Sequence, residues 1–188
     1  GTFVDGNSDG WLDTSTTLYA SSGSQIILYL TWNEWPGAST DYDLYLYDGS
    51  NNVVASSTKY QTGVEEPTES IQVSAPATGT YTVRIQGAGS RRLELFSVYQ
   101  NVSPAIAGGS ILAPANLSTA VAVGAVDQAN YSSGPLQPYS SQGPSNSGSP
   151  KPNLVAPDNV ATGTPPYTTF PGTSGAAPHV AGAAALLL

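Results

Sequence analysis

The feature that most constrains this chain is a period-two alternation of apolar and polar residues, which recurs through the first hundred residues. Residues 26–32 carry one alternating series, and residues 42–47 and 81–85 repeat it. Successive side chains of a strand point to opposite faces, so each series predicts a strand with one buried face. Short apolar runs and Gly/Asn/Asp turns lie between them at close spacing, which is typical of a β-sandwich. No segment of this half predicts a helix.

The pattern changes after residue 100. An apolar run at residues 120–126 predicts a buried strand, and a loop rich in Ser, Gly, Pro and Asn fills residues 128–152. A further strand is expected near Leu154, followed by a buried helix from about Ser174 to the end of the chain. Strand, loop, strand and helix indicate α/β structure. The sequence therefore predicts two parts: an all-β sandwich at 1–100 and a partial α/β fold at 101–188.

Composition excludes several classes of function. Only 10% of the residues are charged, the net charge is −8, and Lys and Arg together number 5. So few cations cannot neutralise many phosphates, which argues against nucleic acid and against an anionic membrane surface as partners. The chain has no Cys, which excludes disulfides and thiolate metal sites. Its final apolar stretch is too short to span a bilayer, and nothing in the composition sets an oligomeric state.

Ser174 is the residue with the clearest chemical potential. It lies among small residues in the segment 172–182, GTSGAAPHVAG, at the start of the predicted helix. Free N–H groups and the positive end of the helix dipole favour a negative charge there, which is what a serine attacking a carbonyl group needs. A serine in this place can equally be a simple helix cap, so the position alone does not decide between the two roles.

The segment 172–182 resembles the nucleophile segment of the subtilisin-like serine proteases, the subtilases, in which a methionine often follows the serine. That methionine is Gly175 here. Three earlier segments resemble the preceding blocks of the same family, in the family's order: residues 118–127, 139–144 and 151–158. The resemblance covers roughly residues 105–188. It implies a peptidase that cleaves protein or peptide substrates through an acyl-enzyme on Ser174, whose own N–H contributes to the oxyanion hole.

The resemblance also implies that part of the catalytic apparatus is missing. His179 is the only histidine, but it matches a structural histidine of the family and lies five residues after Ser174, about 140° around the helix. The family's catalytic His and Asp precede the blocks found here, and Asp127 and Asp158 do not match the catalytic Asp. The fragment alone is therefore expected to be inactive, with its strand and helix lacking their usual neighbours.

The first half resembles the small β-sandwich modules of secreted bacterial peptidases, including the pre-peptidase C-terminal type. The resemblance rests on residues 41–48, 69–71 and 79–83. In some subtilases such a module is inserted in the catalytic domain ahead of the blocks described above. The resemblance implies an extracellular, secreted protein whose signal peptide lies outside this sequence.

A second chemical feature is the acidic segment at residues 5–13, DGNSDGWLD. Oxygen side chains at Asp5, Asn7, Asp9 and Asp13, with a glycine for a sharp turn, match the beginning of a calcium-binding loop. Thr16 stands where a full EF-hand loop has a bidentate Glu. The segment therefore predicts either a structural calcium site or an ordinary Asp/Asn/Gly turn.

Aromatic residues of the first half, at Trp32, Trp35, Tyr42, Tyr45 and Tyr47, are expected mainly to pack, with a ligand-binding role open for Tyr45 and Tyr47. A competing hypothesis gives the sandwich the main role. In it, the chain is a calcium-dependent binding or adhesion module attached to a degenerate protease.

Overall fold

The computed structural model describes residues 1–163, 166 and 168–187. The chain divides into two compact units, Gly1–Ala105 and Ile106–Leu188, and each is described by itself. The predicted helix was expected to reach Leu188, which lies outside the described residues. Within the described part of the chain, no helix combines the length and the apolar character needed to cross a membrane.

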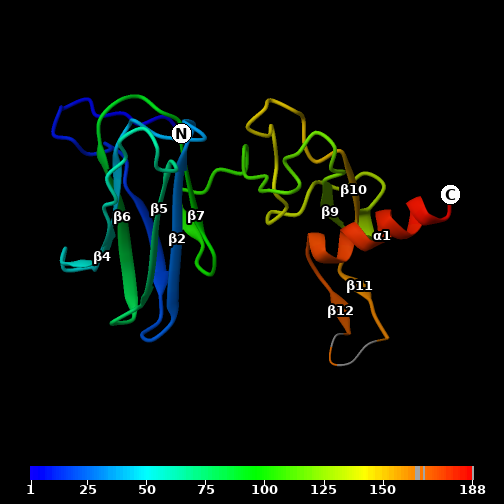
Figure 1. Cartoon of the computed structure of the whole chain (residues 1–188). Coiled ribbons are helices and arrows are strands. Elements are labelled where there is room, and N and C mark those ends of the chain that lie inside the picture. Colours follow the sequence, from blue (N-terminus) through cyan, green and yellow to red (C-terminus); the bar gives the residue numbers. More distant parts are fainter. Residues whose placement is uncertain (164–165, 167, 188) are drawn as a thin grey trace. The chain divides into compact units, whose positions relative to one another are not determined.

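The first unit consists of two antiparallel sheets (Figure 1). The larger sheet has the strand order β4-β3-β6-β1-β8, and the smaller has the order β5-β2-β7. The strands are β1 (Thr16–Ala20), β2 (Gln25–Trp32), β3 (Tyr42–Tyr47), β4 (Val53–Ser57), β5 (Thr68–Ser74), β6 (Gly79–Gly87), β7 (Leu93–Ser97) and β8 (Val102–Ser103).

One continuous apolar core joins the two sheets. In β2 and β3 every second side chain is buried, as the alternation predicted. The fully buried residues of the core come from both sheets and include Leu28, Leu30, Trp32, Tyr42 and Leu44. Apolar faces of two sheets packed on each other make a sandwich, so the prediction of a β-sandwich is confirmed.

Two strands of this unit were not predicted. Strand β1 lies between β6 and the edge strand β8 of the larger sheet, and Leu18 of β1 pairs with Val102 of β8. Only Leu18 and Ala20 of β1 are buried, so its sequence carries too few apolar residues to show the alternation. The pairing of β8 places residues beyond 100 in the sandwich sheet.

The second unit is built around a parallel strand pair and one helix. Strands β9 (Val123–Asp127) and β10 (Leu154–Asp158) pair in parallel, and helix α1 (Thr173–Ala185) packs against both (Figure 1). A 3-10 turn at Gln128–Asn130 follows β9, and β11 (Val160–Ala161) pairs with β12 (Thr169–Phe170) ahead of the helix. This is the expected partial α/β fold.

The core of this unit is small. It consists of Ala125 on β9, Ala156 on β10 and Ala176 on α1, with Val123 and Val180 beside them. The helix was expected to be buried, and this expectation is wrong for its second half. From residue 181 onward α1 is exposed, and Leu186 and Leu187 are 89% and 88% exposed, because the two strands cover only the first turns.

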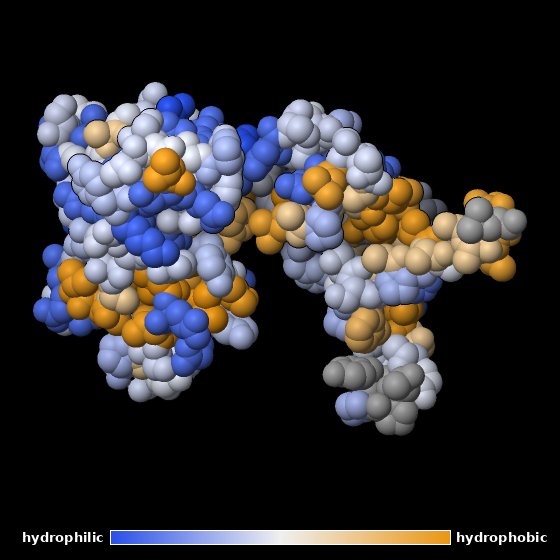
Figure 2. All heavy atoms as spheres, in the orientation of Figure 1, coloured by the Kyte–Doolittle hydropathy of each residue, from blue (hydrophilic) through white to orange (hydrophobic). Residues whose placement is uncertain are grey.

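Apolar side chains therefore remain on the surface of the second unit. Val121, Leu154 and Val155 are 63%, 41% and 44% exposed. Figure 2 shows the apolar surface around β10 and at the end of α1. The expectation that the strand and helix of this half lack packing partners agrees with these exposures.

Candidate active site

Ser174 lies at the N-terminal end of α1, as predicted. It is the second residue of the helix, its side chain is exposed, and the neighbouring N-cap is Gly172. The first N–H groups of a helix have no acceptor within it, so the N–H of Ser174 belongs to the set that can donate to an outside oxygen. The hydroxyl group of Ser174 makes no hydrogen bond with any residue that the structure describes.

Gly172 turns the chain into the helix. Its φ of 92° and ψ of 169° lie in a region that residues with a side chain rarely adopt, and no side chain caps the helix there. Its N–H donates to a carboxylate oxygen of Asp158 at 2.9 Å. Asp158, which lies outside α1, therefore helps to fix the direction in which the chain enters the helix.

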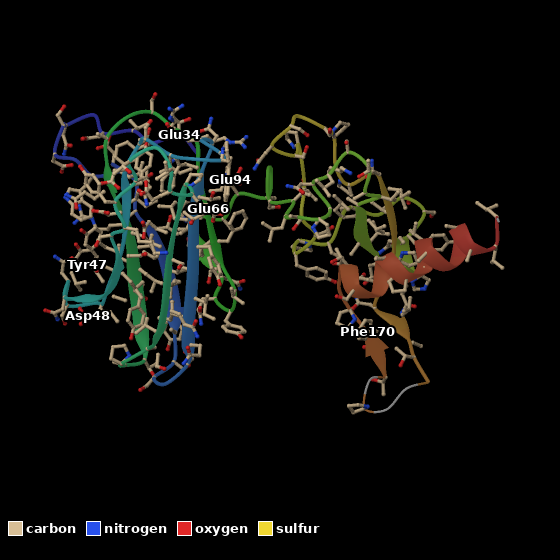
Figure 3. All side chains as sticks on the ribbon, in the orientation of Figure 1. Glu34, Tyr47, Asp48, Glu66, Glu94 and Phe170 are labelled. Atoms are coloured by element: carbon tan, nitrogen blue, oxygen red, sulfur yellow. The ribbon has the colours of Figure 1, made fainter. Side chains whose placement is uncertain are left out.

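Gly175, which stands where the family often has methionine, lies against the backbone of β12. A Cβ atom at this position would be 2.8 Å from the carbonyl oxygen of Phe170, which is too close for any side chain without a backbone shift. Figure 3 shows Phe170 on β12, next to the start of α1. The glycine thus allows the chain before the helix to pass directly over its first turn.

Asp158 ends β10 and is completely buried. It accepts hydrogen bonds from the Gly172 N–H, from the hydroxyl group of Tyr139, and from Nε2 of Gln137 at 3.1 Å. Burial alone would raise the pKa of Asp158, but these hydrogen bonds outweigh it and hold the pKa below its usual value. The hydrogen bond between Tyr139 and Asp158 raises the pKa of the Tyr139 hydroxyl group.

Asp127 is the register partner of Asp158 at the end of β9. Carboxyl ends of parallel strands meet at one edge of a sheet, so the two carboxylates are neighbours there, and Nε2 of Gln137 lies between them. Asp127 accepts hydrogen bonds from the Ala129 N–H at 2.8 Å and from Nδ2 of Asn159 at 3.1 Å. Its hydrogen bonds with the described residues do not include one to Gly172.

His179 does not pair with Ser174. Its Nδ1 lies 2.8 Å from the carbonyl oxygen of Gly175, one turn earlier in the same helix. No other histidine is present in the chain, so within it Ser174 has no imidazole base. This geometry agrees with the structural role predicted for His179.

The four residues predicted to hold calcium lie in one loop, but their oxygens are directed at the loop's own amides. Asp5 accepts from the N–H groups of Asp9 and Gly10 at 3.1 and 2.9 Å, and Asp13 accepts from the Gly6 N–H at 2.9 Å. Asn7 and Asp9 bond to each other at 3.1 Å. Across the described ranges, no three Asp, Glu, His or Cys side chains converge in an arrangement that could hold a metal ion. The side-chain oxygens of this loop therefore fit the hydrogen bonds of a turn better than the coordination of a calcium ion.

Four of the five aromatic residues pack as expected, but the expectation is wrong for Trp35, which is 57% exposed. Trp32 and Tyr42 are in the core with their ring centroids 5.3 Å apart. On the outer face, Tyr45 contacts Trp11 at 5.2 Å, and the Arg84 guanidinium lies 4.4 Å from the Trp11 ring centroid and 5.8 Å from that of Tyr47. Arg84 thus lies over Trp11 and Tyr47, and Tyr45 packs against Trp11.

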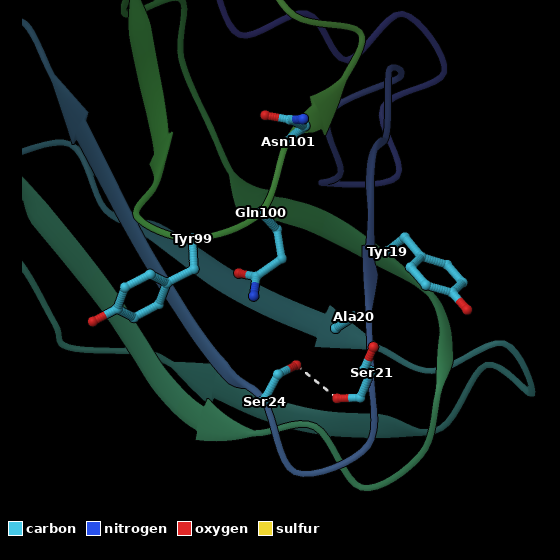
Figure 4. Close-up of a pocket in the computed structure, with 7 residues that line it drawn as sticks. All are labelled: Tyr19, Ala20, Ser21, Ser24, Tyr99, Gln100 and Asn101. Carbon is cyan, nitrogen blue, oxygen red and sulfur yellow. Dashed lines mark hydrogen bonds between the residues drawn. The ribbon is translucent and has the colours of Figure 1, made fainter. Parts of the chain in front are cut away.

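A shallow cavity of about 530 Å³ opens on the sandwich (Figure 4). Its lining residues are Tyr19, Ala20, Ser21, Ser24, Tyr99, Gln100 and Asn101. The lining contains no carboxylate, amine or imidazole, and Ser24 donates to the Ser21 carbonyl oxygen at 2.6 Å. The cavity therefore offers no acid–base pair for hydrolysis.

From the sequence alone, Asp158 is only an aspartate that does not match the catalytic Asp of the family. The structure shows that it contacts the Gly172 amide, two residues before Ser174. Its position at the carboxyl end of a predicted strand was the available signal, because polar residues there gather around sites in α/β sheets. Tyr139 and Gln137, in the long loop, had no comparable signal.

Comparison with protein-family models agrees with this architecture. Residues 55–188 match the subtilase family (Peptidase_S8), and residues 14–87 match the bacterial pre-peptidase C-terminal domain. The first match covers more than half of the chain and includes β9, β10 and the whole Ser174 segment. The chain therefore belongs to the subtilase family of serine peptidases and carries a pre-peptidase C-terminal type β-sandwich ahead of its α/β part.

Proposed function

We propose that this chain carries the nucleophile of a secreted subtilisin-like serine endopeptidase. The observation that carries the proposal is the place of Ser174: exposed, second in α1, with small residues on either side. Its hydroxyl oxygen attacks the carbonyl carbon of a peptide bond, and the amine product leaves with the proton that the hydroxyl group loses. Water then hydrolyses the acyl-enzyme and restores the serine.

The N–H of Ser174 stabilises the negative oxygen of the tetrahedral intermediate. It lies at the positive end of the helix dipole, where a developing oxyanion is favoured. The small residues before Ser174, Gly172 and Thr173, leave space for a substrate backbone to approach. The catalytic base and its aspartate come from residues outside these 188, since His179 bonds to its own helix.

The chain alone is accordingly inactive in this proposal. In subtilisin itself, loss of the serine or histidine lowers kcat by about 10⁶-fold. The test measures hydrolysis of a fluorogenic peptide by the 188-residue chain and by a longer polypeptide that supplies the base and acid. We expect activity only in the longer polypeptide, and none after Ser174→Ala. A rate in the short chain that depends on Ser174 would overturn the proposal.

We also propose that the protein is secreted and that it binds a structural calcium ion. The match to the pre-peptidase C-terminal domain and a composition rich in Ser, Thr, Gly, Tyr and Asn with few lysines support an extracellular protein. Calcium at Asp5, Asn7, Asp9 and Asp13 is supported by the spacing of their oxygens, while the hydrogen bonds that Asp5 and Asp13 accept within the loop favour the alternative of a turn. Detection of the protein in the culture medium of its source, with its signal sequence removed, tests the first proposal.

A further inference from the structure

Asp158 accepts a hydrogen bond from the Gly172 amide at the start of α1. Gly172 is the N-cap of α1, and no side chain caps this helix. The direction in which the chain enters α1 therefore depends on the backbone torsions of Gly172 itself, which glycine adopts more freely than any other residue. The N–H···carboxylate contact of 2.9 Å removes part of this freedom from outside the helix.

The acceptor is itself firmly held. Asp158 is fully buried at the end of β10, and its oxygens also receive the Tyr139 hydroxyl group and Gln137 Nε2. Within the described part of the chain, neither of the two ion pairs involves it, so hydrogen bonds alone replace its lost hydration. Two residues before it on the same strand, Ala156 packs against Ala176 of the helix. Strand β10 thus fixes the helix at two points, through apolar contact and through Asp158.

We propose that Asp158 is a positioning residue of the peptidase reaction, whose carboxylate fixes the Gly172 amide and thereby the location of Ser174 two residues later. The inference rests on the proposed role of Ser174. Asp158 does not touch the reacting atoms. It acts through the peptide that joins the end of β12 to the first turn of α1.

Two substitutions separate the shape of this side chain from its charge. Asp158→Ala removes all three hydrogen bonds, and we expect kcat to fall about tenfold or more with KM within a few-fold, because misplaced reacting groups mainly slow the chemical step. Asp158→Asn keeps the shape and one oxygen that can accept the Gly172 N–H, so the fall in kcat should be smaller. Asp127→Asn is the matched control, since Asp127 occupies the same register position on β9 without a hydrogen bond to Gly172.

The first measurement needs no activity. In the 188-residue chain labelled with ¹⁵N-glycine, hydrogen exchange of the Gly172 amide is followed by NMR in the parent and in the three variants. We expect exchange about tenfold faster or more in Asp158→Ala, less change in Asp158→Asn, and no change in Asp127→Asn. If Asp158→Ala does not fold, the exchange rate of the Gly172 amide in Asp158→Asn is the deciding measurement. An unchanged exchange rate in every folded Asp158 variant overturns the inference.

The second measurement uses the longer polypeptide that supplies the base and acid. Steady-state kinetics of the same variants are compared with those of Ser174→Ala. A fall in kcat at nearly constant KM in the Asp158 variants, absent in Asp127→Asn, supports the inference. If Ser174→Ala abolishes hydrolysis while all Asp158 variants keep full kcat, the inference fails and the proposed function stands. If Ser174→Ala keeps its activity, the proposed function fails, and the inference fails with it.

Discussion

Nδ1 of His179 lies 2.8 Å from the carbonyl oxygen of Gly175, one helical turn before it. The hydrogen bond ties the imidazole to its own helix and leaves Ser174 without a base in this chain. The proximity of a serine and a histidine in sequence is therefore misleading here, because the helix turns the two side chains about 140° apart.

Substituting His179 should affect stability more than chemistry. We expect His179→Gln to cost about 1 kcal/mol of stability, the value of one hydrogen bond, and to leave the shape of the pH–rate profile of the active longer polypeptide unchanged. A general base would instead carry the acidic limb of that profile. Loss of that limb in His179→Gln would contradict the structural role.

Adding one methyl group at Gly175 should destabilise α1. The Cβ atom of Gly175→Ala would lie 2.8 Å from the carbonyl oxygen of Phe170, so we expect a loss of about 1–3 kcal/mol. The matched control is Gly182→Ala in the same helix, where a Cβ atom meets nothing within 4 Å. That variant should gain about 0.5–1 kcal/mol from helix propensity alone. Chemical denaturation followed by helical circular dichroism compares the two, and equal effects would contradict the close contact.

The sandwich should lose stability in acid through Glu34, which Figure 3 labels. Burial alone would raise its pKa, but hydrogen bonds from Ser39 and Thr40 outweigh it and lower the pKa from 4.5 to about 2, and Arg91 pairs with it at 2.7 Å. Because the folded pKa is the lower one, the stabilisation is present above about pH 4.5 and is lost as the pH falls towards 2.

Urea denaturation at about pH 6 and at about pH 2 measures this contribution. We expect Glu34→Gln to cost about 1.5–3 kcal/mol at the higher pH, the range for hydrogen bonds to a charged group, and much less at the lower pH. The same loss at both pH values would show that the charge of Glu34 contributes nothing.

Calcium binding by the 5–13 loop can be tested by calorimetry. The prediction requires a saturable heat in the parent chain that Asp9→Ala abolishes. Asp48→Ala is the control, because Asp48 also accepts backbone N–H groups in a turn, at 2.9 Å, but lies outside the 5–13 loop. No heat in the parent would reject calcium and leave the loop closed by the hydrogen bonds of Asp5 and Asp13.

The parts of the fold that sequence predicted well are those where burial alternates strongly. Strands β2 and β3 each bury every second residue, so their residues reveal them directly. Strand β1 has only two buried apolar residues and pairs with β6, far along the chain, while β11 and β12 have two residues each, too few to show an alternation. Pairing of that kind is set by tertiary structure, which local periodicity does not record.

In the candidate site, too, some features could be predicted from the sequence and others could not. The place of Ser174 at a helix start and the separation of His179 from it follow from helical geometry and were predictable. The hydrogen bond between Asp158 and Gly172 joins residues 14 positions apart across a hairpin, and its donor is a backbone amide. A backbone donor leaves no trace in residue identity, so this contact required the structure.

The central claim is that Ser174 is the nucleophile and that its base lies outside these 188 residues. Its most direct test is labelling with a fluorophosphonate, followed by mass spectrometry of the modified peptide, in the short chain and in the longer polypeptide with the base and acid. The account predicts one label, on Ser174, in the longer polypeptide, and none in the short chain or in Ser174→Ala. Labelling of Ser174 in the short chain, or an unlabelled Ser174 in a longer polypeptide that hydrolyses peptides, would contradict it.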